Sequence, residues 1–179
     1  MSVKSHIRSF LGGKKMAALP SGTSAPPITL TDTGGKKRSL AETLQNGPVL
    51  AAFFKVSCPT CQFTMPFLSR LQQRYGGSKF TLLGISQDDA RDTRDFCEEY
   101  GLKFPALIDE HGYPVSNEYG LTNVPTMFWI NPDGQIQQTS VGFSKADLEQ
   151  MAARAAQVTG QPPASLFKPG EVVPATKPG

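Results

Sequence analysis

The chain of 179 residues has little of several features that mark special protein classes. It has only three cysteines, which excludes the disulfide-dense scaffold of small secreted domains. It has no run of about 18 apolar residues, the length that a membrane-spanning helix needs. Charged residues make up 18% of the chain and hydrophobic residues 39%, which is typical of a folded globule rather than of a disordered chain. We therefore expect one folded domain and no membrane partner.

The net positive charge is confined to the two ends of the chain. The net charge is +3, but residues 1–20 hold four basic and no acidic side chains, and residues 161–179 are also net basic. The remaining residues are therefore slightly acidic overall, and the sequence predicts no nucleic-acid partner. The start of the chain lacks the apolar core of 7–15 residues typical of a signal peptide. These features predict a cytoplasmic location, with an exported or periplasmic protein as the alternative if the true start lies elsewhere.

Proline and glycine divide the chain into three parts. We expect a flexible basic leader over residues 1–20, a domain over residues 21–160, and a proline-rich tail over residues 161–179. The tail holds five of the 15 prolines, so it cannot form a long helix or a central strand. We expect it to be extended, and either mobile or lying over the surface. Both ends are expected to be dispensable for folding.

Hydrophobic patterning within the domain predicts an α/β fold. The apolar run at 49–54 has the length of a strand that is buried on both faces. Apolar residues at helical spacing follow over 59–75, and a second buried strand is expected over 80–85. Another helix, a short strand, a hairpin and a last helix follow, and a shorter hairpin precedes them all. Alternating strands and helices predict parallel pairing, so we expect a mixed central β-sheet flanked by helices, with an N-terminal β-hairpin extension.

A Cys-x-x-Cys motif stands at the junction of the first buried strand and the following helix. Cys58 is expected at the helix N-terminus, where free N–H groups and the helix dipole lower the pKa of a thiol from about 8.5 to roughly 3.5–7.5. Pro59 suits the first helical position, and Thr60 completes the loop. Cys61 is one turn further on. The pattern therefore predicts thiol–disulfide exchange, in which Cys58 attacks a disulfide and Cys61 resolves the mixed disulfide. This chemistry needs no cofactor.

The cysteine pair has three alternative interpretations. A zinc site would need two more soft ligands, and only Cys97, His6 and His111 remain, none at ligand spacing, so no metal is predicted. A structural disulfide in so small a loop would contribute little stability. A redox-inactive interaction module that merely keeps the motif stays an alternative function. For Cys97, which lies on the apolar face of a predicted helix, we expect the role of a small core hydrophobe.

Residues 54–66, with the sequence FKVSCPTCQFTMP, resemble the active-site segment of the TlpA/ResA-type and redoxin-type thiol–disulfide oxidoreductases of the thioredoxin-like superfamily. The resemblance extends over about residues 24–158 and implies a thioredoxin fold. It also implies that Val124, Pro125 and Thr126 form the cis-proline loop that faces the cysteines and lines the substrate groove. A peroxiredoxin-like peroxidase is a second alternative. That family has Pro-x-x-x-Thr-x-x-Cys, whereas Ala51 and Lys55 stand at the proline and threonine positions here.

The sequence departs from the family where a proton carrier would be expected. Ser57 stands where a tryptophan is usual, and Ala52 occupies the position of the buried acid in thioredoxin. Asp88 or Asp89, just after the second buried strand, is a possible proton carrier for Cys61, although acids are also common at the start of a helix. The expected partners are a protein disulfide substrate and an unidentified electron donor or acceptor. The chain is expected to be a monomer.

Overall fold

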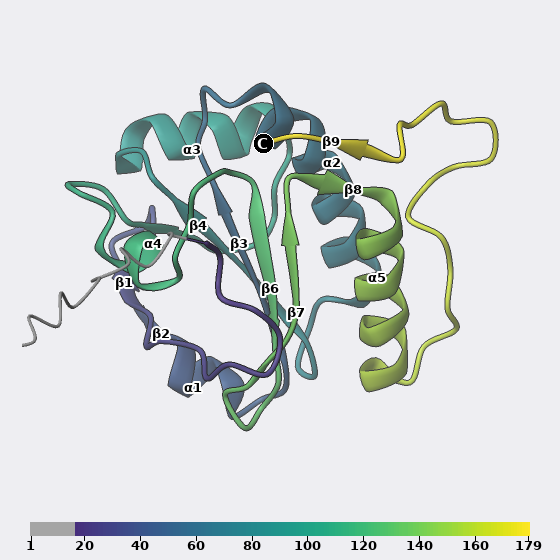
Figure 1. The fold of residues 1–179 in the computed structure, drawn as a ribbon, viewed down its shortest axis with the longest axis horizontal. Helices are drawn as coiled ribbons and strands as arrows, with labels where there is room; N and C mark the ends of the chain where they lie inside the picture. The colour runs from purple at the N-terminus through teal and green to yellow at the C-terminus, as the bar shows by residue number, and fades with distance from the viewer. Residues whose placement is uncertain (1–16) are drawn as a thin grey trace, which may run out of the picture.

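A mixed sheet of five strands forms the centre of the structure, a computed structural model that describes residues 17–179 (Figure 1). The strands are β3 (Val49–Phe54), β4 (Thr81–Ser86), β5 (Ala106–Ile108), β6 (Thr126–Ile130) and β7 (Ile136–Val141), and their order in the sheet is β5-β4-β3-β6-β7. Strands β3, β4 and β5 are parallel, whereas β6 runs antiparallel to both β3 and β7. The mixed sheet predicted from the sequence is therefore confirmed.

Strand β3 is central because both of its faces are apolar. Its side chains alternate between two hydrophobic clusters, one on each face of the sheet: Leu50, Ala52 and Phe54 belong to the first, and Val49, Ala51 and Phe53 to the second. All six residues are buried, as expected for a strand covered on both sides. This strand carries the chain directly to Cys58.

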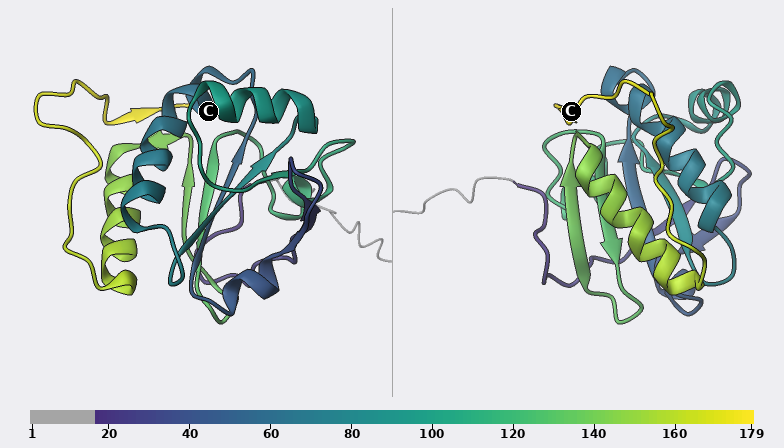
Figure 2. Two further views of the ribbon diagram at one scale, coloured as in Figure 1. Left: turned by 180° about the vertical axis from the view of Figure 1, so that it is seen from behind. Right: turned by 90° about the vertical axis from the view of Figure 1, so that its right-hand side faces the viewer.

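Helices cover both faces of the sheet (Figure 2). The helices α2 (Pro59–Tyr75), α3 (Ala90–Glu99) and α5 (Lys145–Thr159) contribute to the first cluster. The second cluster lies under the hairpin of β1 (Thr29–Thr31) and β2 (Lys37–Ser39) together with α1 (Leu40–Leu44) and α4 (Pro114–Glu118). The N-terminal hairpin extension predicted from the sequence is therefore present.

Part of the predicted leader lies against the domain. Residues 1–16 are outside the described residues. Within residues 17–20, the Leu19 N–H donates to the Tyr119 carbonyl at 3.1 Å, and the Leu19 carbonyl accepts from the Thr139 hydroxyl at 2.6 Å. The contacts with the domain therefore begin a few residues before the predicted boundary at residue 21.

The tail lies over the domain surface, which is one of the two arrangements expected for it. Leu166 and Phe167 are buried in the first cluster, and Arg70 of α2 holds Glu171 through two hydrogen bonds of 2.8 Å. Its last strand, β9 (Thr176–Lys177), pairs antiparallel with β8 (Phe143–Ser144). These contacts disagree with the expectation that the tail is dispensable for folding. A segment that buries aromatic and aliphatic side chains stabilises the domain it covers.

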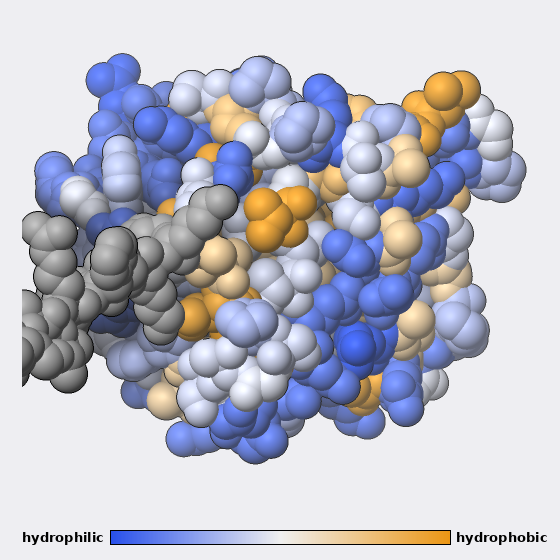
Figure 3. All heavy atoms as spheres, in the orientation of Figure 1, coloured by the Kyte–Doolittle hydropathy of each residue, from blue (hydrophilic) through white to orange (hydrophobic). Residues whose placement is uncertain are grey.

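The described surface has few large apolar side chains. Only Val141, Val158 and Val172 are exposed among the large hydrophobic residues of the described chain. On the face shown in Figure 3, apolar residues form small separate patches among polar ones, as is normal for a protein surface. Val172 lies in the tail and is 98% exposed, which makes it a useful control position for experiments on that segment.

Candidate active site

Cys58 and Cys61 lie at the N-terminus of α2, immediately beyond β3. Cys58 is the N-cap residue, and its sulfur accepts a hydrogen bond from the Cys61 N–H at 3.2 Å. Pro59 occupies the first turn, where its missing N–H leaves no hydrogen bond unmade. Both cysteines are free thiols. The sulfur of Cys58 therefore faces the positive end of a helix of 17 residues.

The two thiols differ in exposure. Cys58 is partly exposed, whereas Cys61 is completely buried beneath the first turn of α2. Burial raises the pKa of the Cys61 thiol, and the neighbouring Cys58 and the charge of Asp88 raise it further. Cys61 is therefore protonated at neutral pH, and only Cys58 is open to a large disulfide substrate.

The loop before β6 faces the Cys58 sulfur. The Val124–Pro125 peptide bond is cis, which is the isomer that the resemblance implies. The Cys58 thiol donates to the Val124 carbonyl at 3.3 Å. The Thr126 hydroxyl donates to the Asn123 carbonyl at 2.7 Å, and the Gly142 N–H donates to the Pro125 carbonyl at 2.8 Å. The loop is therefore held from both sides, with one main-chain carbonyl directed at the exposed cysteine.

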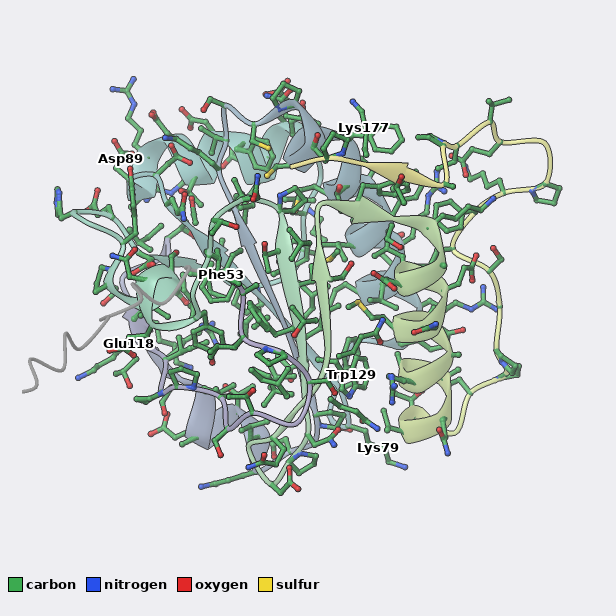
Figure 4. The ribbon with its side chains drawn as sticks, viewed as in Figure 1. Phe53, Lys79, Asp89, Glu118, Trp129 and Lys177 are labelled. Carbon is green, nitrogen blue, oxygen red and sulfur yellow. The ribbon has the colours of Figure 1, made fainter. Side chains whose placement is uncertain are left out.

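The two candidate proton carriers have different surroundings. Asp88 is partly buried, and its carboxylate accepts from the Val56 N–H at 2.7 Å in the loop that leads to Cys58. Asp89 is exposed and caps α3 by accepting from the Asp92 N–H at 2.8 Å. Figure 4 shows Asp89 at the edge of the molecule at the start of α3. The charge of Asp88 acts on Cys61, whereas the geometry of Asp89 matches the helix-start role that the sequence also allowed.

A third cysteine singled out in the sequence, Cys97, lies in α3, outside the Cys-x-x-Cys motif. Cys97 is partly buried in α3 against the first cluster, and burial, with the charge of Glu98, raises the pKa of its thiol to about 11. Within residues 17–179, no group of three or more His, Cys, Asp or Glu side chains is arranged to hold a metal ion.

Sequence reasoning missed one participant, the end of the tail. The Thr60 hydroxyl donates to the Pro178 carbonyl at 2.6 Å, and the Asn123 side-chain amide donates to the Gly179 carbonyl at 3.1 Å. Thr60 is only 7% exposed, although it lies in the first turn of α2 next to the partly exposed Cys58 and the exposed Pro59. The prolines of the tail indicated an extended segment, but no local pattern indicated where it would dock.

A partly exposed thiol on a helix N-terminus, a buried thiol one turn later and a cis-proline loop opposite define a thioredoxin-like thiol–disulfide exchange site. The family model named Redoxin matches residues 20–156 of the chain. The chain is 31% identical over 122 residues to the thiol-disulfide oxidoreductase ResA of Bacillus thuringiensis, covering 68% of this chain and 69% of that protein. The chain therefore belongs to the redoxin family and is a thiol–disulfide oxidoreductase.

Solved structures confirm the thioredoxin fold. The thioredoxin domain of a thiol-disulfide oxidoreductase from Bacteroides vulgatus superposes with a TM-score of 0.68 at 23% identity, covering 76% of this chain and 98% of that one. A secreted disulfide oxidoreductase of Mycobacterium tuberculosis, homologous to the Escherichia coli protein DsbE, superposes with a TM-score of 0.60 at 24% identity, covering 73% and 95%.

The cytoplasmic location predicted from the sequence is wrong. It is overturned by the relationship to oxidoreductases of the ResA and DsbE types, of which the Mycobacterium tuberculosis protein is secreted. The prediction depended on the missing apolar core in residues 1–20, most of which lie outside the described residues. No helix within residues 17–179 has both the length and the apolar character needed to cross a membrane.

Proposed function

We propose that the chain exchanges disulfides with protein substrates through Cys58 as the nucleophile and Cys61 as the resolving thiol. The observation that carries this proposal is the difference between the two thiols. Cys58 is accessible, and its sulfur accepts the Cys61 N–H at 3.2 Å. Cys61 is fully buried and protonated, so it cannot make the first attack.

The exchange proceeds in two steps. The Cys58 thiolate attacks one sulfur of the substrate disulfide, a mixed disulfide forms, and the other substrate sulfur leaves as a thiolate that takes up a proton. Cys61 then loses its proton and attacks the Cys58 sulfur, which releases the second substrate thiol and leaves a Cys58–Cys61 disulfide. The substrate is reduced by two electrons and the pair is oxidised by two. An external dithiol donor must reduce the pair again, and in the reverse direction the same steps oxidise a substrate.

The surrounding residues have supporting roles in this proposal. Val124, Pro125 and Thr126 line the groove in which an extended substrate segment pairs with the exposed main chain. Asp88, whose carboxylate accepts the Val56 N–H beside the Cys58 loop, takes the proton of Cys61 at the second step. In this proposal the domain of residues 21–160 carries out the disulfide exchange, as a monomer and without metal or nucleic acid.

Reduction of insulin, with dithiothreitol as the electron donor, tests the roles of the cysteines. Cys58→Ser is expected to abolish catalysis. When the reduced Cys61→Ser variant is mixed with insulin in the absence of dithiothreitol, it should accumulate a mixed disulfide with the substrate on Cys58, visible as a mass increase that added dithiothreitol removes. Cys97→Ser is the matched control and should keep full turnover. If Cys61→Ser turns over at the wild-type rate, or if the substrate is trapped on another residue, the assigned roles are wrong.

A further inference from the structure

Residues 175–179 lie across the candidate active site. In Figure 1 the end of the chain passes β8 and reaches the N-terminal end of α2. Phe143 pairs with Lys177 and Ser144 with Thr176 in an antiparallel ladder, and the Lys145 N–H donates to the Ala175 carbonyl at 2.9 Å. The segment is therefore bound as an added strand, which is a common mode of peptide recognition.

Both walls of the site hold the last two residues. On one wall, Thr60 of the Cys-x-x-Cys loop binds the Pro178 carbonyl, and on the other, Asn123 beside the cis-proline loop binds the Gly179 carbonyl. The fit is close, because a Cβ atom on Gly179 would lie 2.5 Å from the Val124 carbonyl oxygen. This is the same carbonyl that accepts the Cys58 thiol. The segment thus occupies the space that a substrate strand needs beside Cys58.

The contacts are made mainly to the main chain of the segment. Besides the β8–β9 ladder, the carbonyl groups of Ala175, Pro178 and Gly179 accept hydrogen bonds from the domain. One side-chain contact is the Lys177 ammonium, which lies 5.5 Å from the centre of the Phe63 ring in α2. Figure 4 shows Lys177 at the end of the molecule toward which β3 and β4 point. Main-chain recognition does not depend on sequence, so an unrelated extended peptide can make the same bonds.

The segment has no cysteine, so it can fill the groove but cannot react there. It is tethered upstream by Phe167 and by the Arg70–Glu171 ion pair. Between this anchor and Ala175, Val172 and Pro174 are exposed. Residues 175–179 contribute no buried side chain, so they can leave the groove while the anchor stays in place.

We propose that residues 175–179 act as an intramolecular ligand of the substrate groove, and that an extended segment of the protein substrate must displace them to reach Cys58. That the displacing segment belongs to a disulfide substrate of this chain rests on the proposed function. A short tether gives its segment an effective concentration of about a millimolar. Weak main-chain contacts are therefore enough to keep the groove occupied.

The test compares a peptide disulfide with a small disulfide as substrates of the same chain. A variant that ends at Pro174 keeps the anchor, and we expect its kcat/KM for an extended peptide disulfide to rise about fivefold or more, since the tethered competitor is removed. Its kcat/KM for hydroxyethyl disulfide should change less than about twofold, because this molecule does not need the strand site. Gly179→Ala in the full chain should shift the peptide rate in the same direction by a smaller factor. Val172→Ala is the tail control and should change neither rate.

Binding of the segment is measured separately from catalysis. In the Cys58→Ser/Cys61→Ser chain ending at Pro174, a synthetic peptide of residues 172–179 should shift the amide resonances of Thr60 and Asn123. The full-length double variant should bind it at least about fivefold more weakly, since its own segment competes. The proposal is overturned if the variant ending at Pro174 reduces the peptide disulfide at an unchanged or lower rate, or if its rates for the two disulfides rise equally. It is also overturned if the synthetic peptide does not bind. If the peptide binds but no variant reduces any disulfide, the proposed function fails and the groove assignment stands.

Discussion

Phe167 allows a direct test of whether the tail is part of the folded domain. Its ring lies 4.9 Å from that of Phe67 and 6.3 Å from that of Phe143, measured between ring centres, and the Lys145 ammonium lies 5.1 Å from its centre. The side chain is 8% exposed, although it is only eight residues past the end of the last long helix. Phe→Ala at a buried site costs about 3–5 kcal/mol, and a site at the domain surface can partly collapse, so we expect a loss of about 3 kcal/mol.

The loss is measured by urea and thermal unfolding of the full-length variant. For a chain of this size, each kcal/mol lowers Tm by about 2–4 °C, so Phe167→Ala should lower Tm by about 6–12 °C. Val172→Ala is the matched control, since its side chain is 98% exposed, and it should leave Tm unchanged. A loss below about 1 kcal/mol, comparable to an ordinary surface change, would refute the packing of residues 166–167 on the domain.

Three further predictions follow from the ionisable groups. In the Cys58→Ser/Cys61→Ser variant, alkylation of Cys97 should speed up about tenfold per pH unit and level off only near its pKa of about 11; levelling off near pH 8.5 would show an ordinary exposed thiol. The pKa of Glu171 is lowered from 4.5 to about 2, chiefly by its hydrogen bonds to Arg70. The stability that it contributes is present above pH 4.5 and lost as the pH falls toward 2, so wild type and Glu171→Gln should converge in acid unfolding across that window, and a constant difference would contradict the ion pair. Asp88→Asn keeps an acceptor for the Val56 N–H. It should slow resolution of the mixed disulfide at neutral pH by about 10²-fold, and the rate should recover at high pH. Faster resolution would show that the carboxylate acts only by raising the Cys61 pKa.

The fold and the reactive pair were predictable because their signals are local. The run from Val49 to Phe54 is apolar at every position, and its length of six residues favours a strand covered on both faces. The three-residue spacing of Cys58 and Cys61, with Pro59 between them, fits the first turn of a helix. Each of these inferences depends on residues that are close in the chain.

The surroundings of the pair were less predictable because they depend on contacts between distant residues. Asp88 and Asp89 are adjacent and equivalent in composition, yet one accepts from Val56, 32 residues away, and the other caps its own helix. The location failed for a related reason, since it was inferred from residues 1–20 alone and overturned by relatives matched over the domain. A local pattern states which conformations a segment can adopt, whereas its partners are decided by the whole fold.

The tail combines both cases. Its prolines exclude a helix or a central strand, and this part of the inference was sound because it concerns the backbone of the segment itself. Its position follows instead from Phe167, which enters an aromatic cluster built by residues of α2 and β8, and from Arg70, which is 101 residues from its partner Glu171. Once these anchors are fixed, residues 175–179 are carried to the groove, where bonds to their main chain suffice. A segment whose sequence has no apparent binding motif is thus placed beside Cys58 by anchors that lie outside the active site.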